Sequence, residues 1–230
     1  SNGKVFARTN KGEGASTVNE QEKRGCEVIV VSHTHWDREW RYTVEQSKLR
    51  LVQLLDSLIE IMERKESYKY FILDGGTVIL DDYLSVRPQN VERLKKLISQ
   101  GRIQVVSFYT LPDMFIVCGE AIVRNLLYGR KVAEGMGGCM KSGYTATSYG
   151  QNLQMPQIYR GFGIDSIIFY RGLNKHHPPC LRWRSPDGSE ILTLRCFDFV
   201  TRTNWFFTVH QILVLRKGIR DLEYHYKQEE

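Results

Sequence analysis

Residues 26–40 read CEVIVVSHTHWDREW, an apolar run followed at once by two histidines, acidic residues and two tryptophans. The unbroken run of β-branched residues within 26–31 is typical of a parallel strand covered on both faces. The carboxyl ends of such strands are where parallel sheets bind ligands and assemble catalytic groups. The sequence therefore predicts a buried parallel strand that carries a functional site at its end.

A metal pair is the first candidate within this segment. His35 and Asp37 are two positions apart, so in an extended backbone their side chains lie on one face and can converge on one ion. An imidazole and a carboxylate oxygen suit zinc, at about 2.0–2.2 Å per ligand bond. The alternative is that His33 and His35 are hydrogen-bonded core residues, but their acidic and indole neighbours favour a site. Trp40 offers an indole face to a sugar ring, or is simply packed.

The rest of the chain alternates strands with helices. Apolar residues at helical spacing predict an amphipathic helix over 44–65. Helices after parallel strands indicate a βα repeat whose right-handed crossovers bring every strand's carboxyl end to one face. The turn chemistry of Ser185-Pro186-Asp187-Gly188-Ser189 predicts a hairpin of strands 181–184 and 190–196. Further helices are expected at 77–84, 91–100, 121–136 and 154–160, and further strands at 68–73, 102–109, 139–142 and 166–170.

Composition limits the classes of function and the domain plan. The chain has 230 residues, 42% hydrophobic and 25% charged, which is typical of a globular domain. The net charge of +6 comes from scattered basic residues, so we expect no nucleic-acid partner. No apolar run reaches the ~20 residues of a membrane span. Five dispersed cysteines without a C-x-x-C predict free thiols and a cytoplasmic location. Residues 1–25 are expected to be a flexible leader, 26–207 a β/α domain, and 208–230 the start of a helical segment.

Several segments together resemble the N-terminal catalytic domain of the glycoside hydrolase family 38 α-mannosidases, particularly the bacterial type. The likeness runs from about residue 26 to residue 187, and the order and spacing of its segments make it specific. These segments are HTHWDREW at 33–40, LDG at 73–75, LPD at 111–113, GEAIVRNLL at 119–127, QMPQI at 154–158, GFGID at 161–165 and RG at 171–172.

The resemblance implies an α/β fold: a parallel β/α barrel-like domain of the seven-stranded type, truncated in this chain. It implies a zinc ion held in part by His35 and Asp37, and retaining hydrolysis of α-mannosides or oligosaccharides. By the same similarity, Trp40 forms the floor of a sugar subsite and Arg171 contacts substrate, although Arg171 has the alternative of a structural ion pair. Asp113 is expected near the metal and substrate, or as a helix cap after Pro112.

The chain departs from the family pattern at several positions. Thr147 stands where the family has the aspartate that is both nucleophile and zinc ligand. A neutral hydroxyl cannot replace that carboxylate without an activating base. The remaining histidine ligand of the family lies downstream of this chain's end. Three further positions differ from the family: Gly76 for glutamine, Phe108 for tryptophan and Met114 for glutamate.

Three functional hypotheses follow. The first is an α-mannosidase impaired by Thr147 and by truncation, with Asp198 as a general acid/base candidate or else a turn aspartate. The second is a non-catalytic descendant that binds a carbohydrate or metal. The third is a different metal-dependent hydrolase on a similar scaffold. An incomplete barrel would also expose surface that needs a partner, either a second copy in a homo-oligomer or the remainder of a longer chain.

Overall fold

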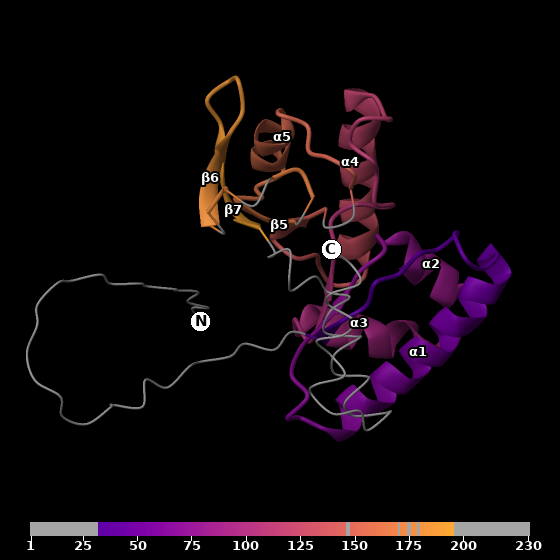
Figure 1. Cartoon of the computed structure of the whole chain (residues 1–230). Coiled ribbons are helices and arrows are strands. Elements are labelled where there is room, and N and C mark those ends of the chain that lie inside the picture. The colour runs from indigo at the N-terminus through magenta and orange to yellow at the C-terminus, as the bar shows by residue number, and fades with distance from the viewer. Residues whose placement is uncertain (1–31, 146–147, 170, 174–175, 179, 196–230) are drawn as a thin grey trace, which may run out of the picture. The chain divides into compact units, whose positions relative to one another are not determined.

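A computed structural model describes residues 32–145, 148–169, 171–173, 176–178 and 180–195 (Figure 1). Within them, strands alternate with helices as predicted. The expected strand at 26–31, the leader and the helical tail lie outside the described residues, as do Thr147 and Asp198. No helix in the described part of the chain is both long and apolar enough to cross a bilayer.

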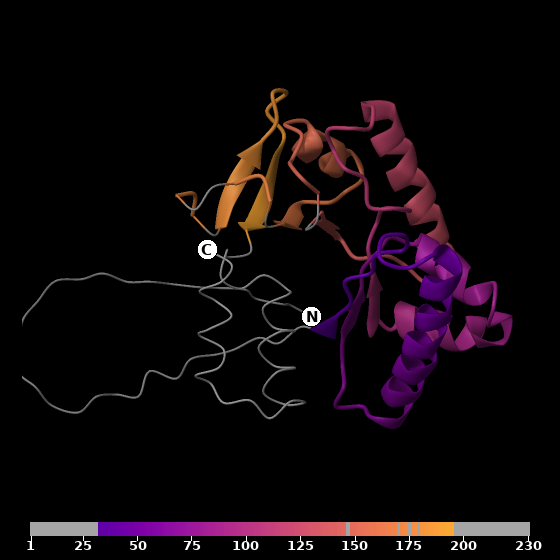
Figure 2. The same cartoon turned by 45° about the vertical axis from the view of Figure 1, so that its right-hand side comes forward.

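The first half of the described chain forms a three-stranded parallel sheet in the order β1-β2-β3. Its strands are β1 (Ser32–His33), β2 (Phe71–Leu73) and β3 (Ile103–Val105). The helices of this half are α1 (Val44–Arg64), α2 (Val78–Leu84) and α3 (Val91–Ser99), with the 3-10 turn η1 (Pro88–Asn90) before α3. In Figure 2 these indigo to purple helices lie together on one side of the strands. Their apolar faces therefore cover a single face of the sheet.

Helix α1 begins where its capping chemistry requires. The Thr43 hydroxyl accepts a hydrogen bond from the Gln46 N–H at 3.3 Å, and the Gln46 side chain accepts one from the Thr43 N–H at 3.1 Å. This reciprocal capping box satisfies two backbone donors that have no partner inside the helix. Leu55 and Ile59 on its apolar stripe are fully buried, as the helical spacing predicts.

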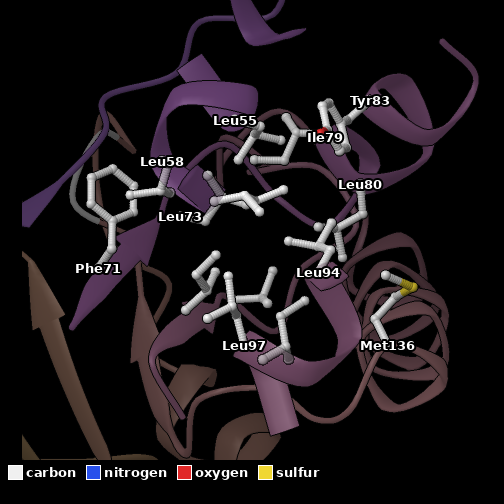
Figure 3. Close-up of a cluster of buried hydrophobic side chains, with 14 of the residues drawn as sticks. Leu55, Leu58, Phe71, Leu73, Ile79, Leu80, Tyr83, Leu94, Leu97 and Met136 are labelled. Carbon is white, nitrogen blue, oxygen red and sulfur yellow. The ribbon is translucent and has the colours of Figure 1, made fainter. Parts of the chain in front are cut away.

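A first core lies between these helices and strands (Figure 3). Leu55 of α1, Leu73 of β2, Leu80 of α2 and Leu94 of α3 are all fully buried. One leucine from each of four elements meets at one place, and full burial of such a side chain stabilises the fold by about 1.5–3 kcal/mol. The strands and helices that carry the end of β1 are therefore held by a shared apolar core.

The second half forms a four-stranded sheet in the order β4-β5-β7-β6. The first three strands of that order are parallel, and β6 pairs antiparallel with β7, so the predicted hairpin is confirmed. A second core cluster packs beneath this sheet. The elements of this second half are α4 (Gly119–Gly135), β4 (Ser142–Tyr144), α5 (Met155–Gly161), β5 (Ser166–Phe169), β6 (Cys180–Arg184) and β7 (Glu190–Arg195).

Three predicted strands differ from their expected bounds by three or more residues. The β2 strand begins at Phe71 instead of residue 68. The β3 strand stops at Val105, and the backbone beyond it bonds to the start of α2: Phe108 C=O accepts from Thr77 N–H. The β4 strand begins at Ser142 instead of spanning 139–142. Just before it, Met140 N–H donates to Val105 C=O at 2.9 Å, which joins the two sheets by a backbone hydrogen bond.

The fold class is α/β with parallel sheets, as predicted. The described strands form two small open sheets, so these residues do not show the expected seven-stranded barrel.

A glycine pair in α4 tests the packing of this helix against the segment after β3. A Cβ on Gly129 would lie 2.3 Å from Tyr109 N, whereas a Cβ on Gly135 would meet nothing within 4 Å. We expect Gly129→Ala to destabilise the chain by about 1–3 kcal/mol through overpacking. Gly135→Ala should be neutral or stabilising by up to about 1 kcal/mol. Urea unfolding of both variants measures the difference, and equal stabilities would contradict this packing.

The ionisation of Tyr83 makes the free energy of unfolding depend on pH in the alkaline range. Burial, assisted by the hydrogen bond that its hydroxyl donates to Asp56 at 2.7 Å, raises the pKa of Tyr83 to about 12. A folded-state pKa above the unfolded value of about 10 gives stability that is complete below pH ~10 and lost as pH rises towards 12. We expect the unfolding free energy to fall over this range, and to fall less steeply in Tyr83→Phe. Urea titrations between pH 9 and 11.5 measure the slope, and an unchanged slope in the variant would refute the assignment.

Candidate functional site

The segment after β1 alternates between partly buried and exposed side chains. Thr34, Trp36 and Arg38 are partly buried, whereas the intervening His35 and Asp37 are exposed. This is the period of two that an extended backbone imposes. The partly buried residues can thus attach the segment to the protein, while the intervening histidine and aspartate face outward together.

Two of the attachment points connect the segment to the end of β2. The Thr34 hydroxyl accepts a hydrogen bond from Asp74 N–H at 3.0 Å, and Thr34 N–H donates to Ile72 C=O at 3.2 Å. Trp36 packs on the first core and over Gly75, where an added Cβ would lie 2.8 Å from the Trp36 Cβ. Gly75 also has φ +110°, a conformation that side-chain-bearing residues rarely adopt. Glycine at this position therefore lets the indole lie against the backbone.

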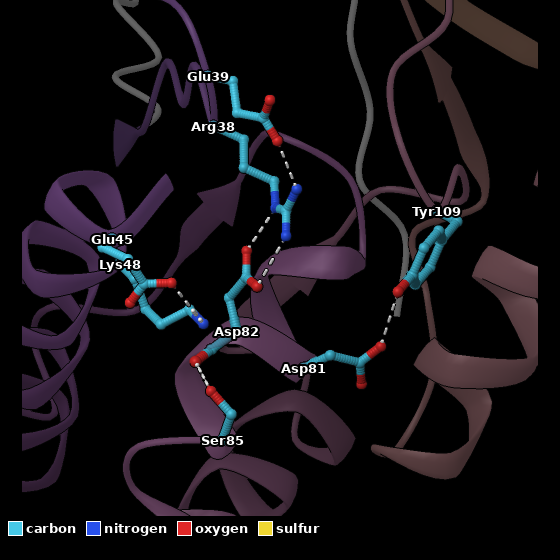
Figure 4. A network of polar contacts seen from close by, with 8 residues as sticks. All are labelled: Arg38, Glu39, Glu45, Lys48, Asp81, Asp82, Ser85 and Tyr109. Atoms are coloured by element: carbon cyan, nitrogen blue, oxygen red, sulfur yellow. Dashed lines mark hydrogen bonds and ion pairs between the residues drawn. The ribbon is translucent and has the colours of Figure 1, made fainter. Parts of the chain in front are cut away.

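The third attachment point is an ion pair to α2 (Figure 4). Arg38 Nε donates to Asp82 Oδ2 at 2.7 Å, and Arg38 Nη2 donates to Asp82 Oδ1 at 3.1 Å. The Asp82 hydrogen bond is the main cause that raises the pKa of the Arg38 guanidinium above its usual value. The Arg38 guanidinium therefore keeps its positive charge, as arginine does in folded proteins.

His35 lies between two carboxylates. Its Nε2 is 3.3 Å from Asp37 Oδ2, and its Nδ1 is 3.5 Å from Asp74 Oδ2. The Asp74 side chain is 1% exposed and also accepts a hydrogen bond from the Tyr144 hydroxyl at 3.2 Å. His35 and Asp37 follow β1, Asp74 follows β2 and Tyr144 ends β4, so the carboxyl ends of these strands do gather polar side chains.

This donor set fits part of a zinc site. A metal-binding histidine commonly has one ring nitrogen oriented by a carboxylate and the other directed at the ion. Asp74 lies beside Nδ1 of His35 and could orient the ring, whereas Asp37 lies beside Nε2, the nitrogen that would bind the ion. A structural or catalytic zinc site needs three or four protein ligands, and the described residues contain no group of three or more histidine, cysteine or acidic side chains arranged to hold a metal. His35 and Asp37 would thus supply two of the three or four ligands that such a site needs.

Sequence reasoning missed the place of Asp74 beside His35. In the sequence, the LDG segment at 73–75 stands out only as part of the family pattern. The available signal was that Asp74 directly follows β2, because the ends of neighbouring parallel strands meet at one edge of the sheet.

Trp40 and Arg171, the side chains predicted to contact sugar, each pair with a different neighbour. Trp40 is 70% exposed, with the Arg41 guanidinium 4.8 Å from its ring centroid. Arg171 lies over the Tyr149 ring at 4.4 Å. Both arrangements present an exposed aromatic surface beside a cation, which suits the apolar face and the hydroxyls of a sugar.

Asp113 has a local structural role. Its Oδ1 accepts a hydrogen bond from Phe115 N–H at 3.2 Å, within the turn that follows β3. Helix α4 begins later, at Gly119 with Cys118 as its N-cap, so Asp113 caps a turn and not that helix. Contact between Asp113 and a substrate stays a prediction.

The positions that depart from the family pattern are closely packed. Gly76 has φ +85°, and a Cβ there would lie 2.2 Å from Tyr109 O, so no larger side chain fits without a backbone shift. Phe108 and Met114 are each 1% exposed in the second core. These three residues therefore contribute to packing and offer no polar group to a ligand.

Comparison with known proteins decides the family. The model of the "Glycosyl hydrolases family 38 N-terminal domain" matches residues 25–213. The chain belongs to family 38. A relative from Halalkalibacterium halodurans, named "Putative mannosylglycerate hydrolase", is 34% identical over 197 residues, which are 80% of this chain and 21% of that protein. "Alpha-mannosidase G" of Dictyostelium discoideum is 26% identical over 72% of this chain and 16% of its own length.

A solved structure agrees with this membership of family 38. The crystal structure of an alpha-mannosidase from Enterococcus faecalis V583 matches with a TM-score of 0.69 at 34% identity, covering 72% of this chain and 19% of that one. The chain thus spans about a fifth of the length of these relatives.

The hydroxyl of Thr34 provides a test of how the segment is attached. Thr34→Val keeps the side-chain shape but removes the acceptor of the Asp74 N–H, whereas Thr34→Ser keeps the hydroxyl. We expect the valine variant to be about 1 kcal/mol less stable than the serine variant, since a partly buried donor loses its partner. Thermal or urea unfolding measures this, and a serine variant as unstable as the valine variant would count against it.

Proposed function

We propose that this chain is the part of a family 38 glycoside hydrolase that holds a zinc ion and the sugar of an α-mannoside. The observation that carries the proposal is the outward-facing His35–Asp37 pair at the end of β1, backed by the buried Asp74 carboxylate. Relatives that are named alpha-mannosidases support the substrate class. The parallel strands belong, on this proposal, to a barrel-like sheet that the rest of a longer protein completes.

On this proposal, some of the site residues bind the metal and others contact the sugar. His35 Nε2 and an Asp37 oxygen hold the ion, and Asp74 keeps the imidazole ring turned so that Nε2 faces outward. When bound, zinc would hold sugar hydroxyls and favour distortion of the ring towards the oxocarbenium-like transition state. Trp40 provides an apolar floor for the sugar, and Arg171 and Asp113 contact its hydroxyls.

Hydrolysis by this chain is proposed to be weak or absent. Retaining glycosidases use two carboxyl groups about 5–5.5 Å apart, one as nucleophile and one as acid/base. Thr147 occupies the nucleophile position, and a neutral hydroxyl is a poor nucleophile and a poor zinc ligand. Asp198 remains the proposed acid/base. The dense packing at Gly76, Phe108 and Met114 supports the same reading, since these positions also lack their family side chains.

A second candidate is a carbohydrate-binding protein without turnover. It is favoured by a specific combination: the residues that would bind metal and sugar are retained, while the nucleophile is replaced. Binding without hydrolysis distinguishes it from an active glycosidase.

Zinc binding by the 230-residue chain tests the proposal. We expect zinc to bind weakly, to be lost in His35→Ala, and to bind more tightly in Thr147→Asp, which restores an anionic ligand. Equilibrium dialysis with metal analysis measures stoichiometry and affinity. His33→Ala is the matched control, because the Nδ1 of this exposed histidine bonds to the adjacent Thr34 C=O at 2.6 Å. Equal zinc affinity in wild type and His35→Ala would reject the site.

Turnover is tested on a chromogenic α-mannoside with the same proteins. We expect no more than trace hydrolysis by wild type, and a rise in Thr147→Asp if the chain contains the acid/base. Wild-type turnover that is abolished by His35→Ala would show that the chain is an active enzyme and would overturn the proposed impairment.

A further inference from the structure

We propose that the Arg38–Asp82 ion pair is a positioning device that fixes the segment bearing His35, Asp37 and Trp40 on helix α2. The inference deepens the proposed function, because its metal readout depends on the proposed zinc site. It adds two residues that neither bind the metal nor contact the sugar.

Two hydrogen bonds between Arg38 and Asp82 fix the orientation of the guanidinium as well as its distance from the carboxylate. Arg38 Nε and Nη2 each donate to a different oxygen of Asp82, at 2.7 and 3.1 Å. The remaining Nη1 donates to Glu39 Oε1 at 2.9 Å. The guanidinium is therefore bonded to a side chain of its own segment and to a side chain of helix α2 (Figure 4). Two parallel bonds from a planar fork hold an orientation that one flexible ammonium group cannot reproduce.

Burial separates this pair from an ordinary surface contact. Exposed ion pairs contribute about 0–1 kcal/mol and often do not restrain a loop. The Asp82 side chain is 11% exposed and the Arg38 side chain 35% exposed. Removing one partner therefore leaves a mostly buried charge without its counterpart, which is far more costly than losing a solvated pair.

Helix α2 is a suitable anchor because it is held on several sides. Its residues Ile79, Leu80 and Tyr83 are fully buried. Its start donates two backbone hydrogen bonds to the segment after β3, from Thr77 N–H to Phe108 C=O at 2.8 Å and from Val78 N–H to Tyr109 C=O at 3.0 Å. The Tyr109 hydroxyl then donates to Asp81 Oδ2 at 3.1 Å, one residue before Asp82 (Figure 4).

The segment needs such an anchor. Between β1 and α1 the described residues form neither helix nor strand. Thr34 and Trp36 fix its first half at the end of β2, and His35 lies between them. Asp37 and Trp40 lie beyond that region, and Arg38 is the side chain between them that reaches a helix. Asp37 is next to Arg38 in the chain, so the place at which Arg38 is held determines where Asp37 lies relative to His35. The distance between the two side chains that would bind an ion therefore depends on Arg38.

The test compares variants of this pair with variants of a similar pair elsewhere. Arg38→Lys and Asp82→Asn break the two-bond geometry. Arg93→Lys and Glu63→Gln are the matched controls, because Arg93 also makes two side-chain bonds to Glu63 but joins α3 to α1. Each protein is the 230-residue chain, measured by hydrogen-exchange mass spectrometry and by zinc dialysis.

We expect Arg38→Lys and Asp82→Asn to raise hydrogen exchange several-fold in peptides covering 34–42 and to weaken zinc binding about tenfold or more, as for outer partners of metal ligands. The control variants should change neither value. The double variant Arg38→Lys/Asp82→Asn should resemble a single variant, because one interaction can be lost only once. Additive effects, or exchange and affinity no different from the Arg93 controls, would overturn the inference.

The two proposals fail in different ways. If His35→Ala leaves zinc affinity unchanged, the zinc site is wrong, and the exchange of 34–42 alone decides whether the pair holds the segment. If His35→Ala abolishes binding while both Arg38→Lys and Asp82→Asn bind zinc like wild type, the positioning role is wrong and the zinc site stands. Should Asp82→Asn fail to fold, Arg38→Lys, whose side chain is more exposed, carries the same comparison.

Discussion

The contact between the segment after β1 and the end of β2 is the constraint on which the candidate site depends. Thr34 bonds to the backbone of Asp74, and Trp36 lies against Gly75 at a distance that excludes a β-carbon. With these two side chains turned inward, the two-residue period of the backbone turns His35 outward between them. The same contact brings the buried Asp74 carboxylate beside His35 Nδ1. One strand-end contact thus fixes both the His35–Asp37 pair and the carboxylate that lies beside it.

Local signals in the sequence were sufficient for elements that depend on neighbouring residues. Helix α1 was predictable because its apolar stripe has helical spacing and Thr43 with Gln46 forms a capping box. The hairpin was predictable because its turn residues bond within the turn, Gly188 N–H donating to Ser185 C=O at 2.9 Å. That His35 and Asp37 share a face followed from the period of an extended chain, and their 3.3 Å approach agrees with it.

What could not be predicted depends on residues far apart in the chain. Asp74 meets His35 across 39 positions and Tyr144 across 70, and no local pattern specifies either contact. The start of β4 was misplaced because the residues before it bond to the end of β3, a pairing set by how the two sheets meet. No local pattern around Arg38 specifies its partner, and only the fold shows that Asp82, 44 positions away, accepts its hydrogen bond.

The departures from the family pattern form a physically consistent set. A glutamate at the position of Met114, which is 1% exposed, would bury a carboxylate and cost several kcal/mol unless it were paired or bound to a ligand. A methionine there adds apolar contacts to the second core. Gly76 likewise lets two backbone segments approach more closely than any side chain would permit. Active sites commonly sacrifice stability to keep polar groups in place, so small or apolar residues at such positions stabilise the fold. The outward-facing His35 and Asp37, by contrast, impose little cost on the fold, because both side chains are partly solvated.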